Sequence, residues 1–226
     1  MTDRLATYHS LCVDALDVPV IAGFWAGVLG GEVTHRNDGV AFITGRTPRH
    51  TVWVNPVPEP VTVKQRVHLD VHTDDVEDVL ALGATPLDLR SFRWKVLRDP
   101  EGGELCAFER EQVPEDRLYE VVVDCADPQS LATWWAGLIG GRCEYDAEHG
   151  WAGIEEIPEA PFAYLVFVPV PEPKTVKNRI HLDVTTRDLE AIVAAGATVL
   201  RAQDDEIGWT VLADPEGNEF CAFLAS

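Results

Sequence analysis

The sequence predicts an α+β fold in which two tandem domains each contain a strand–helix–strands unit twice. A long repeat is the first observation: VPEPVTVKQRVHLDV at 57–71 returns as VPEPKTVKNRIHLDV at 170–184, with 12 of the 15 positions identical. Flanking segments return in the same order, FWAGVLGGEV as WWAGLIGGRC and DPEGGELCAF as DPEGNEFCAF. Repetition at a nearly fixed spacing indicates a duplicated domain. We therefore predict domains at 1–112 and 117–226, joined near the charged, proline-containing stretch EREQVPEDR.

The C-terminal domain shows the elements of one unit most clearly. Its first strand is LYEVVVDCA, after which Asp127 and Pro128 are typical of a helix N-cap and first turn. The first apolar residue after the cap is followed by others three, four, seven and eight positions later. This spacing predicts a helix with one buried stripe, and Gly140 predicts its end. These apolar residues are Leu131, Trp134, Trp135, Leu138 and Ile139. Short strands follow around RCEYDA, GWAGIEE and FAYLVFVPV.

A second unit of the same kind follows a crossover at the VPEP segment. It opens with the strand NRIHLDV, continues into a helix that ends at Gly196, and closes with strands near TVLRAQ, WTVLAD and NEFCAFL. The N-terminal domain divides in the same way, from TYHSLCVDA to GELCAFE. The chain is therefore predicted to contain four strand–helix–strands units.

Charge and cysteine content restrict the partners. The chain has 38 Asp and Glu against 18 Lys and Arg, a net charge of −20, and no basic block, which disfavours nucleic acid and anionic membranes and attracts small cations. No apolar run is long enough to span a membrane, and the N-terminus lacks the pattern of a signal peptide. Five cysteines without paired spacing favour reduced thiols. We expect a cytoplasmic protein, monomeric or homodimeric, with a small-molecule partner.

The combined motifs resemble the vicinal oxygen chelate superfamily, which includes glyoxalases, bleomycin-resistance proteins and extradiol dioxygenases. The resemblance rests on D-x6-[FW]-W-x3-[LI]-G in the first helix of each domain, the strand R-[VI]-H-L-D-V and the closing D-P-E-G-x-E-[LF]-C. It implies glyoxalase-like domains duplicated in tandem, with four βαβββ modules forming two cup-shaped mixed sheets, each around a site. It does not imply a single reaction, because this superfamily hosts several chemistries and some members only bind.

The resemblance also implies four metal-ligand positions per cup: on the first strand, the fourth strand, the strand that opens the second module, and the last strand. The indole and phenyl rings at the fourth-strand positions cannot ligate, and the N-terminal domain then has fewer than the three protein ligands that catalytic zinc uses. We expect no cofactor in the N-terminal domain. For the C-terminal domain we also expect none, with a divalent metal bound to Glu120, His181 and Cys221 as the alternative. The positions are occupied by Ser10, Trp53, His68 and Cys106 in the first domain and by Glu120, Phe167, His181 and Cys221 in the second.

Strand alternation predicts which side chains face each cup. Side chains alternate between faces, so His68 faces the same way as Asp70, and His181 the same way as Asp183. A carboxylate beside an imidazole suits a general acid or base, or a receptor for a cation; equally, each Asp could only cap the following turn. We predict His181, Glu120 and Asp183 as catalytic groups. The predicted ligand-binding residues are His68, Asp70, Trp53, Trp94, Asp124, Phe167 and Trp209.

Two classes of function follow from these residues. The first is a protein that binds a small hydrophobic or cationic molecule in an aromatic, acidic cup, without a full metal site. The alternative is a glyoxalase-type lyase, isomerase or dioxygenase that uses His181 with Glu120 and Cys221. A scaffold without a ligand is a third interpretation, and whether the protein is an enzyme stays open.

Overall fold

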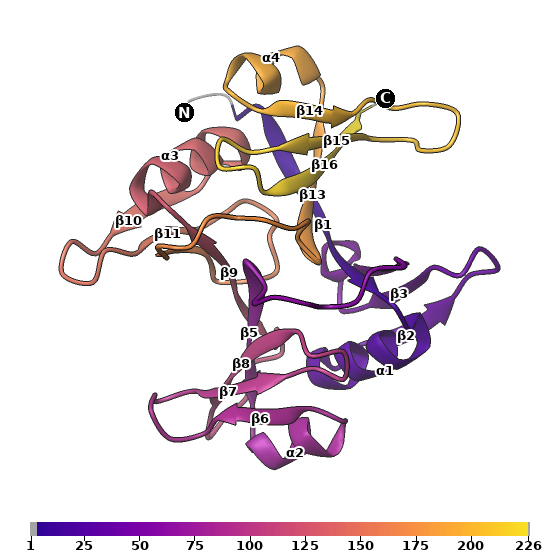
Figure 1. Ribbon diagram of the computed structural model, residues 1–226, viewed down its shortest axis with the longest axis vertical. Helices are drawn as coiled ribbons and strands as arrows, with labels where there is room; N and C mark the ends of the chain where they lie inside the picture. The colour runs from indigo at the N-terminus through magenta and orange to yellow at the C-terminus, as the bar shows by residue number, and fades with distance from the viewer. Residues whose placement is uncertain (1–3, 226) are drawn as a thin grey trace.

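The computed structural model describes residues 4–225, which form four βαβββ modules in chain order (Figure 1). No helix among these residues is long and apolar enough to cross a bilayer. The first module contains β1 (Ala6–Ala15), α1 (Val18–Leu29), β2 (Glu32–His35), β3 (Ala41–Thr44), a short 3-10 helix (Pro48–His50) and β4 (Val52–Pro56). The second contains β5 (Val67–Thr73), α2 (Val76–Ala81), β6 (Thr85–Asp88), β7 (Lys95–Arg98) and β8 (Glu104–Glu109).

The third and fourth modules repeat this order. The third contains β9 (Leu118–Cys125), α3 (Pro128–Ile139), β10 (Arg142–Tyr145), β11 (Ala152–Glu155) and β12 (Tyr164–Pro169). The fourth contains β13 (Ile180–Thr186), α4 (Leu189–Ala194), β14 (Thr198–Arg201), β15 (Thr210–Ala213) and β16 (Glu219–Leu224). The predicted fold class of four βαβββ modules is confirmed.

An aspartate caps each α-helix. The Asp127 carboxylate accepts the backbone N–H of Ser130 at 3.1 Å, as predicted for an N-cap, and Pro128 stands in the first turn. Asp17 caps α1 in the same way through Val20 N. Asp75 and Asp188 do so for α2 and α4. Each cap satisfies a backbone donor that the first turn would otherwise leave free.

Each of the two sheets combines modules from both halves of the chain, which the repeat does not predict. One eight-stranded sheet has the order β14-β15-β16-β13-β1-β4-β3-β2 and joins the first module to the fourth; the other, β10-β11-β12-β9-β5-β8-β7-β6, joins the second to the third (Figure 1). The expectation that residues 1–112 and 117–226 would each close their own cup is therefore wrong. We call the concave side of the first sheet the terminal cup and that of the second the central cup.

The physical reason lies in the strand pairs at the middle of each sheet. β1 pairs antiparallel with β13, and β5 pairs antiparallel with β9. The linker between the halves runs beside β5, where His72 N donates to Arg117 O at 2.8 Å, and thereby places β9 next to β5. Because the first and third modules are alike, as are the second and fourth, either pairing would satisfy the same pattern of apolar residues.

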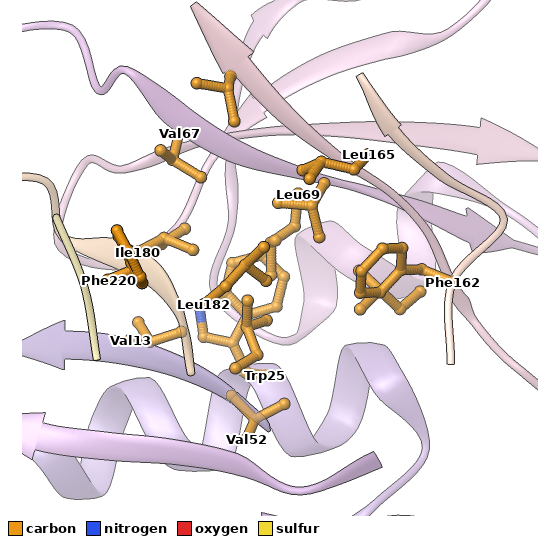
Figure 2. Packing of buried hydrophobic residues seen from close by; sticks show 14 of the residues in the cluster. Val13, Trp25, Val52, Val67, Leu69, Phe162, Leu165, Ile180, Leu182 and Phe220 are labelled. Atoms are coloured by element: carbon orange, nitrogen blue, oxygen red, sulfur yellow. The ribbon is translucent and has the colours of Figure 1, made fainter. Parts of the chain in front are cut away.

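One hydrophobic core lies between the sheets and contains residues of all four modules. Figure 2 shows Trp25 of α1 close to Val52 and Leu182 of the terminal sheet, with Leu69 and Leu165 of the central sheet nearby. Each of these five side chains is at most 5% exposed. The convex faces of the sheets are therefore buried together with the helices, which leaves the concave faces free to form sites.

The crossover segments tie the two sheets together. Arg179 donates to the carboxylate of Glu101 at 2.7 Å and to the backbone carbonyl of Glu59. The same Glu101 carboxylate accepts the N–H groups of Leu16, at 3.0 Å, and Asp17, at 2.7 Å. One carboxylate of the second module thus holds the β1–α1 turn of the first module and the start of β13 in the fourth.

Candidate functional site: two cups of different chemistry

Each sheet encloses a cavity on its concave side. The cavity volume is about 750 Å³ in the central cup and about 790 Å³ in the terminal cup, within the range of small-molecule sites. The alternation predicted along the strands is observed, since His68 and Asp70 line the central cup while His181 and Asp183 line the terminal cup.

The pairing of modules redistributes the predicted site residues. Glu120 and Asp124 lie on β9 and line the central cup with His68, whereas His181 and Cys221 line the terminal cup. The predicted metal site of Glu120, His181 and Cys221 is therefore wrong, because its members belong to different sheets. For the same reason Glu120 cannot act together with His181 and Asp183.

The aromatic residues predicted on the fourth strands have different positions. Trp53 lies opposite Cys12 on β1 and lines the terminal cup together with Trp209, while Trp94 lines the central cup. Phe167 lies opposite Val123 and is fully buried in the core, so its predicted role in ligand binding is wrong. It is one residue out of phase with the side chains of β12 that line the cup, which are Tyr164, Val166 and Val168.

The floor of the central cup contains an acid pair. Asp70 on β5 lies directly opposite Glu120 on β9, and both carboxyl groups are mostly buried. Burial, followed by the neighbouring charge of Asp70, raises the pKa of Glu120 to about 8. The Glu120 carboxyl is therefore protonated at neutral pH. Its O–H group can donate a hydrogen bond to the Asp70 carboxylate.

An imidazole and a thiol adjoin this pair. His68 Nε2 lies 3.3 Å from Asp70 Oδ1, without the alignment of a hydrogen bond, and Cys106 lies beside Asp70 on β8. The donor atoms of His68, Asp70 and Cys106 all lie within 4.8 Å of one another. The floor thus offers one nitrogen, one sulfur and two carboxylates to a ligand.

Aromatic rings form a continuous wall above the acid pair. The rings of Phe92 and Trp94 stack with centroids 4.9 Å apart, and Trp94 stacks on Phe108 at 5.5 Å. Phe108 meets Tyr119 edge to face at 5.2 Å. The Arg110 guanidinium lies over the rings of Phe108 and Tyr119, 5.3 and 5.5 Å from their centroids.

Most residues of this wall were not predicted from the sequence. Phe108 is two residues beyond Cys106 on the same strand, so alternation would have placed it in the cup. Tyr119 also lines the cup although it precedes Glu120, because the register shifts at this point of the β5–β9 pair. No sequence pattern in this chain marks that bulge.

The floor of the terminal cup has different donors at the equivalent positions. Ser10 replaces Glu120 and Cys12 replaces Val122, as the registers of β1 and β9 show. Asp183 Oδ2 accepts hydrogen bonds from the Ser10 hydroxyl at 2.8 Å and from the Cys12 thiol at 3.2 Å. Cys221 Sγ lies 3.5 Å from His181 Nε2.

Charge also distinguishes the cups. Among residues 4–225, five carboxylate residues and one lysine line the central cup, whereas five carboxylate residues and three lysine or arginine residues line the terminal cup. Lys64 pairs with Asp124 in the central cup, and Lys177 pairs with Asp14 at the equivalent position of the terminal cup. The central cup is therefore the more acidic of the two.

The family profile of the glyoxalase-like domain matches residues 10–108 and again 120–223. The chain belongs to the glyoxalase-like domain family. The predicted resemblance and its tandem duplication are confirmed by these two matches. None of the curated proteins compared with the chain matches it.

Solved structures of low sequence identity share the fold of this glyoxalase-like protein. Glyoxalase I from Zea mays is 14% identical, with a TM-score of 0.64 over 96% of this chain and 92% of that one. The cppA protein from Streptococcus pneumoniae TIGR4 is 12% identical, with a TM-score of 0.53 over 99% of both chains. At such identities the likeness extends to the fold alone.

The family resemblance implies a metal, and the donor sets decide where one fits. In the central cup the implied positions Glu120, His68 and Cys106 line one cavity, and the donor atoms that lie within 4.8 Å of one another there, those of His68, Asp70 and Cys106, are a set of imidazole, carboxylate and thiol that suits a zinc-like ion. The donors around His68 were predicted to be Ser10 and Cys106, whereas the cup that contains His68 holds Glu120, opposite Asp70, in place of Ser10. In the terminal cup the implied positions hold Ser10, Trp53, His181 and Cys221, which fit such a metal poorly.

Proposed function

We propose that this glyoxalase-like protein binds a small amphipathic organic cation in the central cup. The observation that carries the proposal is the acid pair, Asp70 and Glu120, at the floor of a cavity of about 750 Å³ walled by stacked aromatic rings. Carboxylates beside aromatic faces attract cations by charge and by the ring quadrupole. The planar part of the ligand would lie against Trp94 and Phe108, with its cationic group toward Asp70.

Several features of the central cup support a ligand of this class over an anion. Among residues 4–225, five carboxylate residues line the cup, against Lys64, which is already paired with Asp124, and Arg110, which lies over the rings of Phe108 and Tyr119. Asp70 Oδ1 is buried and has no hydrogen-bond partner, which is costly unless a ligand provides one. A cation next to Asp70 would also favour release of the proton from Glu120, which would add a second negative charge to the contact.

Two ions of matched shape and opposite charge test the proposal. Tetraphenylphosphonium should bind the native chain by isothermal titration calorimetry, and tetraphenylborate should bind far more weakly. Asp70→Asn and Trp94→Ala should lower the affinity for tetraphenylphosphonium roughly 10- to 100-fold, because each removes one buried contact. Asp183→Asn and Trp209→Ala, the equivalent changes in the terminal cup, should change it less than about twofold. Equal binding of both ions, or equal losses in both cups, would contradict the proposal.

A metal-dependent enzyme of glyoxalase type is the second candidate. The convergence of Glu120, His68 and Cys106 in one cup favours it, since these residues occupy three of the metal-ligand positions that the family resemblance implies. A bound metal would supply Lewis-acid polarisation of a substrate oxygen. Asp70, beside His68 and opposite Glu120, would accept or return a proton at its carboxylate. Elemental analysis of protein purified without chelator, with Glu120→Ala and His68→Ala as comparisons, separates this function from metal-free binding.

A further inference from the structure

The central cup has two anionic positions toward opposite ends of one strand. On β9 the side chains of Glu120, Val122 and Asp124 point to the same face and line the cavity. Asp124 therefore lies four positions from the acid pair at Glu120, a separation of roughly 13 Å along the strand. Val122, with Val166 opposite it on β12, lines the cavity between the two positions. The cup thus presents an anionic group at each end of an apolar floor.

The two positions differ in their counter-charges. Among residues 4–225, neither member of the acid pair forms an ion pair with a lysine or an arginine, and Asp70 has His68 beside it. Asp124 instead pairs with Lys64, whose ammonium group donates to its carboxylate. Lys64 therefore supplies a cation of the chain itself at the second position, and the acid pair is the position that a cationic ligand can neutralise.

Lys64 reaches the cup from the crossover segment between β4 and β5, which contains neither helix nor strand. Asp124 N donates to Arg66 O at 2.7 Å, which holds this crossover next to the end of β9. The Asp124 side chain is 4% exposed, whereas the Lys64 side chain is 56% exposed and also lines a cavity between the two crossover segments. The carboxylate is thus a fixed part of the cup, and the ammonium group can leave it without unpacking a core residue.

We propose that Lys64 is a specificity-determining residue that restricts the central cup to ligands with one positive charge. Its ammonium group occupies the second anionic position, so only the acid pair remains for a cationic group of the ligand. The inference rests on the cation-binding function proposed above, and it adds to that function the charge of the ligand and the residue that selects it. Removal of the Lys64 charge is expected to open the cup to dications.

The restriction follows from an exchange of one cation for another. A dication long enough to reach both positions has to displace the Lys64 ammonium group from Asp124, so the contact that it gains there replaces one that the folded chain already has. A monocation bound at the acid pair leaves the Lys64–Asp124 pair intact, and no buried carboxylate loses its partner. The second charge of a dication therefore adds little affinity while Lys64 is present.

The terminal cup contains the same lysine device without the acid pair. Asp14 N donates to Arg179 O at 2.7 Å, and Lys177 pairs with the Asp14 carboxylate. The exposed fractions of the two side chains, 56% and 4%, equal those of Lys64 and its partner. Ser10 occupies the position of Glu120 in this cup. Lys177→Gln is therefore a matched control that makes the same change of charge outside the proposed site.

Decamethonium and decyltrimethylammonium, which carry two and one quaternary ammonium groups on the same ten-carbon chain, test the proposal by calorimetric titration of the full-length protein. The ratio of the two affinities is compared between variants, because the net charge of −20 attracts cations to all of them. Lys64→Gln keeps a hydrogen-bond donor for Asp124 and removes the positive charge. It should raise the affinity for decamethonium roughly 10- to 100-fold, the size of one charged contact. The affinity for decyltrimethylammonium should rise only about twofold, because the lost charge lies far from the acid pair.

Lys64→Arg, Lys177→Gln and the double variant Lys64→Gln/Asp124→Asn should all keep the native ratio within about twofold, and circular dichroism should show the native fold in each. A ratio that Lys64→Gln leaves unchanged, in a folded variant that binds decyltrimethylammonium, would overturn this inference and leave the proposed function standing. An increase that survives in the double variant would also overturn it, because the second ammonium group would then lie elsewhere. Failure of the native chain to bind decyltrimethylammonium and tetraphenylphosphonium would overturn the proposed function together with this inference.

Discussion

Asp70 and Asp183 occupy equivalent positions on β5 and β13, and their neighbours give the two carboxylates different chemistry. Asp183 accepts hydrogen bonds from the Ser10 hydroxyl and the Cys12 thiol. Asp70 instead faces Glu120, whose pKa is raised to about 8 by burial and by Asp70. One cup therefore has a carboxyl group that accepts hydrogen bonds from a hydroxyl and a thiol, and the other has a pair of carboxyl groups of which Glu120 has a raised pKa.

The proton on Glu120 makes stability depend on pH. An acid whose pKa is raised by folding keeps its proton where the unfolded chain has lost it, so stability falls as the pH rises through that range. For Glu120 the range runs from the ordinary value of 4.5 to about 8. Glu120→Gln removes this titration. As the pH rises over this range, the free energy of unfolding of the native chain should therefore fall by on the order of a few kcal/mol relative to that of the variant.

Guanidinium unfolding at a series of pH values measures this difference. Glu104→Gln, which removes a carboxylate that lines the same cup, should retain the pH dependence of the native chain. If Glu120→Gln and the native chain show parallel stability curves between these pH values, the acid pair does not hold its proton as inferred.

At the scale of the element, the end of α3 depends on the absence of side chains. Gly140 and Gly141 have φ values of 84° and 101°, in the region that favours glycine. A Cβ on Gly141 would lie 2.6 Å from Ile154 Cγ2 and 2.8 Å from the carbonyl oxygen of Glu155. The chain therefore passes from α3 into β10 by direct contact of its backbone with β11. The Gly-Gly pair that predicted the end of the helix has this packing role as well.

Two alanine substitutions in and after α3 should have opposite effects. Gly137→Ala, on the exposed side of the helix with nothing within 4 Å of the added Cβ, should stabilise the chain by about 0.5 to 1 kcal/mol. Gly141→Ala should destabilise it by about 2 kcal/mol or more, because a positive φ and a backbone clash combine. Urea unfolding of both variants measures the two changes, and a neutral Gly141→Ala would show that the turn can relax.

The sequence predicts features that depend on spacing within one helix or strand. It does not predict irregularities such as the register shift between β5 and β9. The N-cap at Asp127 and the inward direction of His68 and His181 follow from local spacing, and the structure agrees with both. Phe167 was predicted at the position equivalent to Trp53, but Val166 holds that position, opposite Val122, and Phe167 lies on the other face of β12. Tyr119 was missed because a register shift brings it to the cup.

At the scale of the whole molecule, the repeat predicts four modules but not which modules share a sheet. The second and fourth modules have nearly the same residues at their central strands, β5 and β13, so the sequence does not determine which of the two pairs with β1. The choice determines the site, since it places Glu120 beside His68 and leaves Ser10 and Cys12 with His181. Contacts distant in sequence, such as Arg179 with Glu101, stabilise the observed pairing.

The observed pairing predicts how the chain behaves when it is cut in the linker between residues 112 and 113. Each half contains two modules that belong to different sheets. In the first half, β1 therefore lacks its antiparallel partner β13, and β5 lacks its antiparallel partner β9. The apolar faces that these strands share in one core would be exposed, which favours association over a stable monomer.

Each half expressed alone should therefore be insoluble or self-associated. The two halves expressed together should form a one-to-one complex with the near-ultraviolet circular dichroism of the intact chain. Sedimentation and spectra of the separate and combined halves provide the measurement, and an intact chain with a protease site in the same linker, cut after folding, is the matched control. A half that unfolds cooperatively as a monomer would show that its two modules can close one cup by themselves. The arrangement of the sheets would then depend on the linker, and not on a preference of β1 for β13 and of β5 for β9.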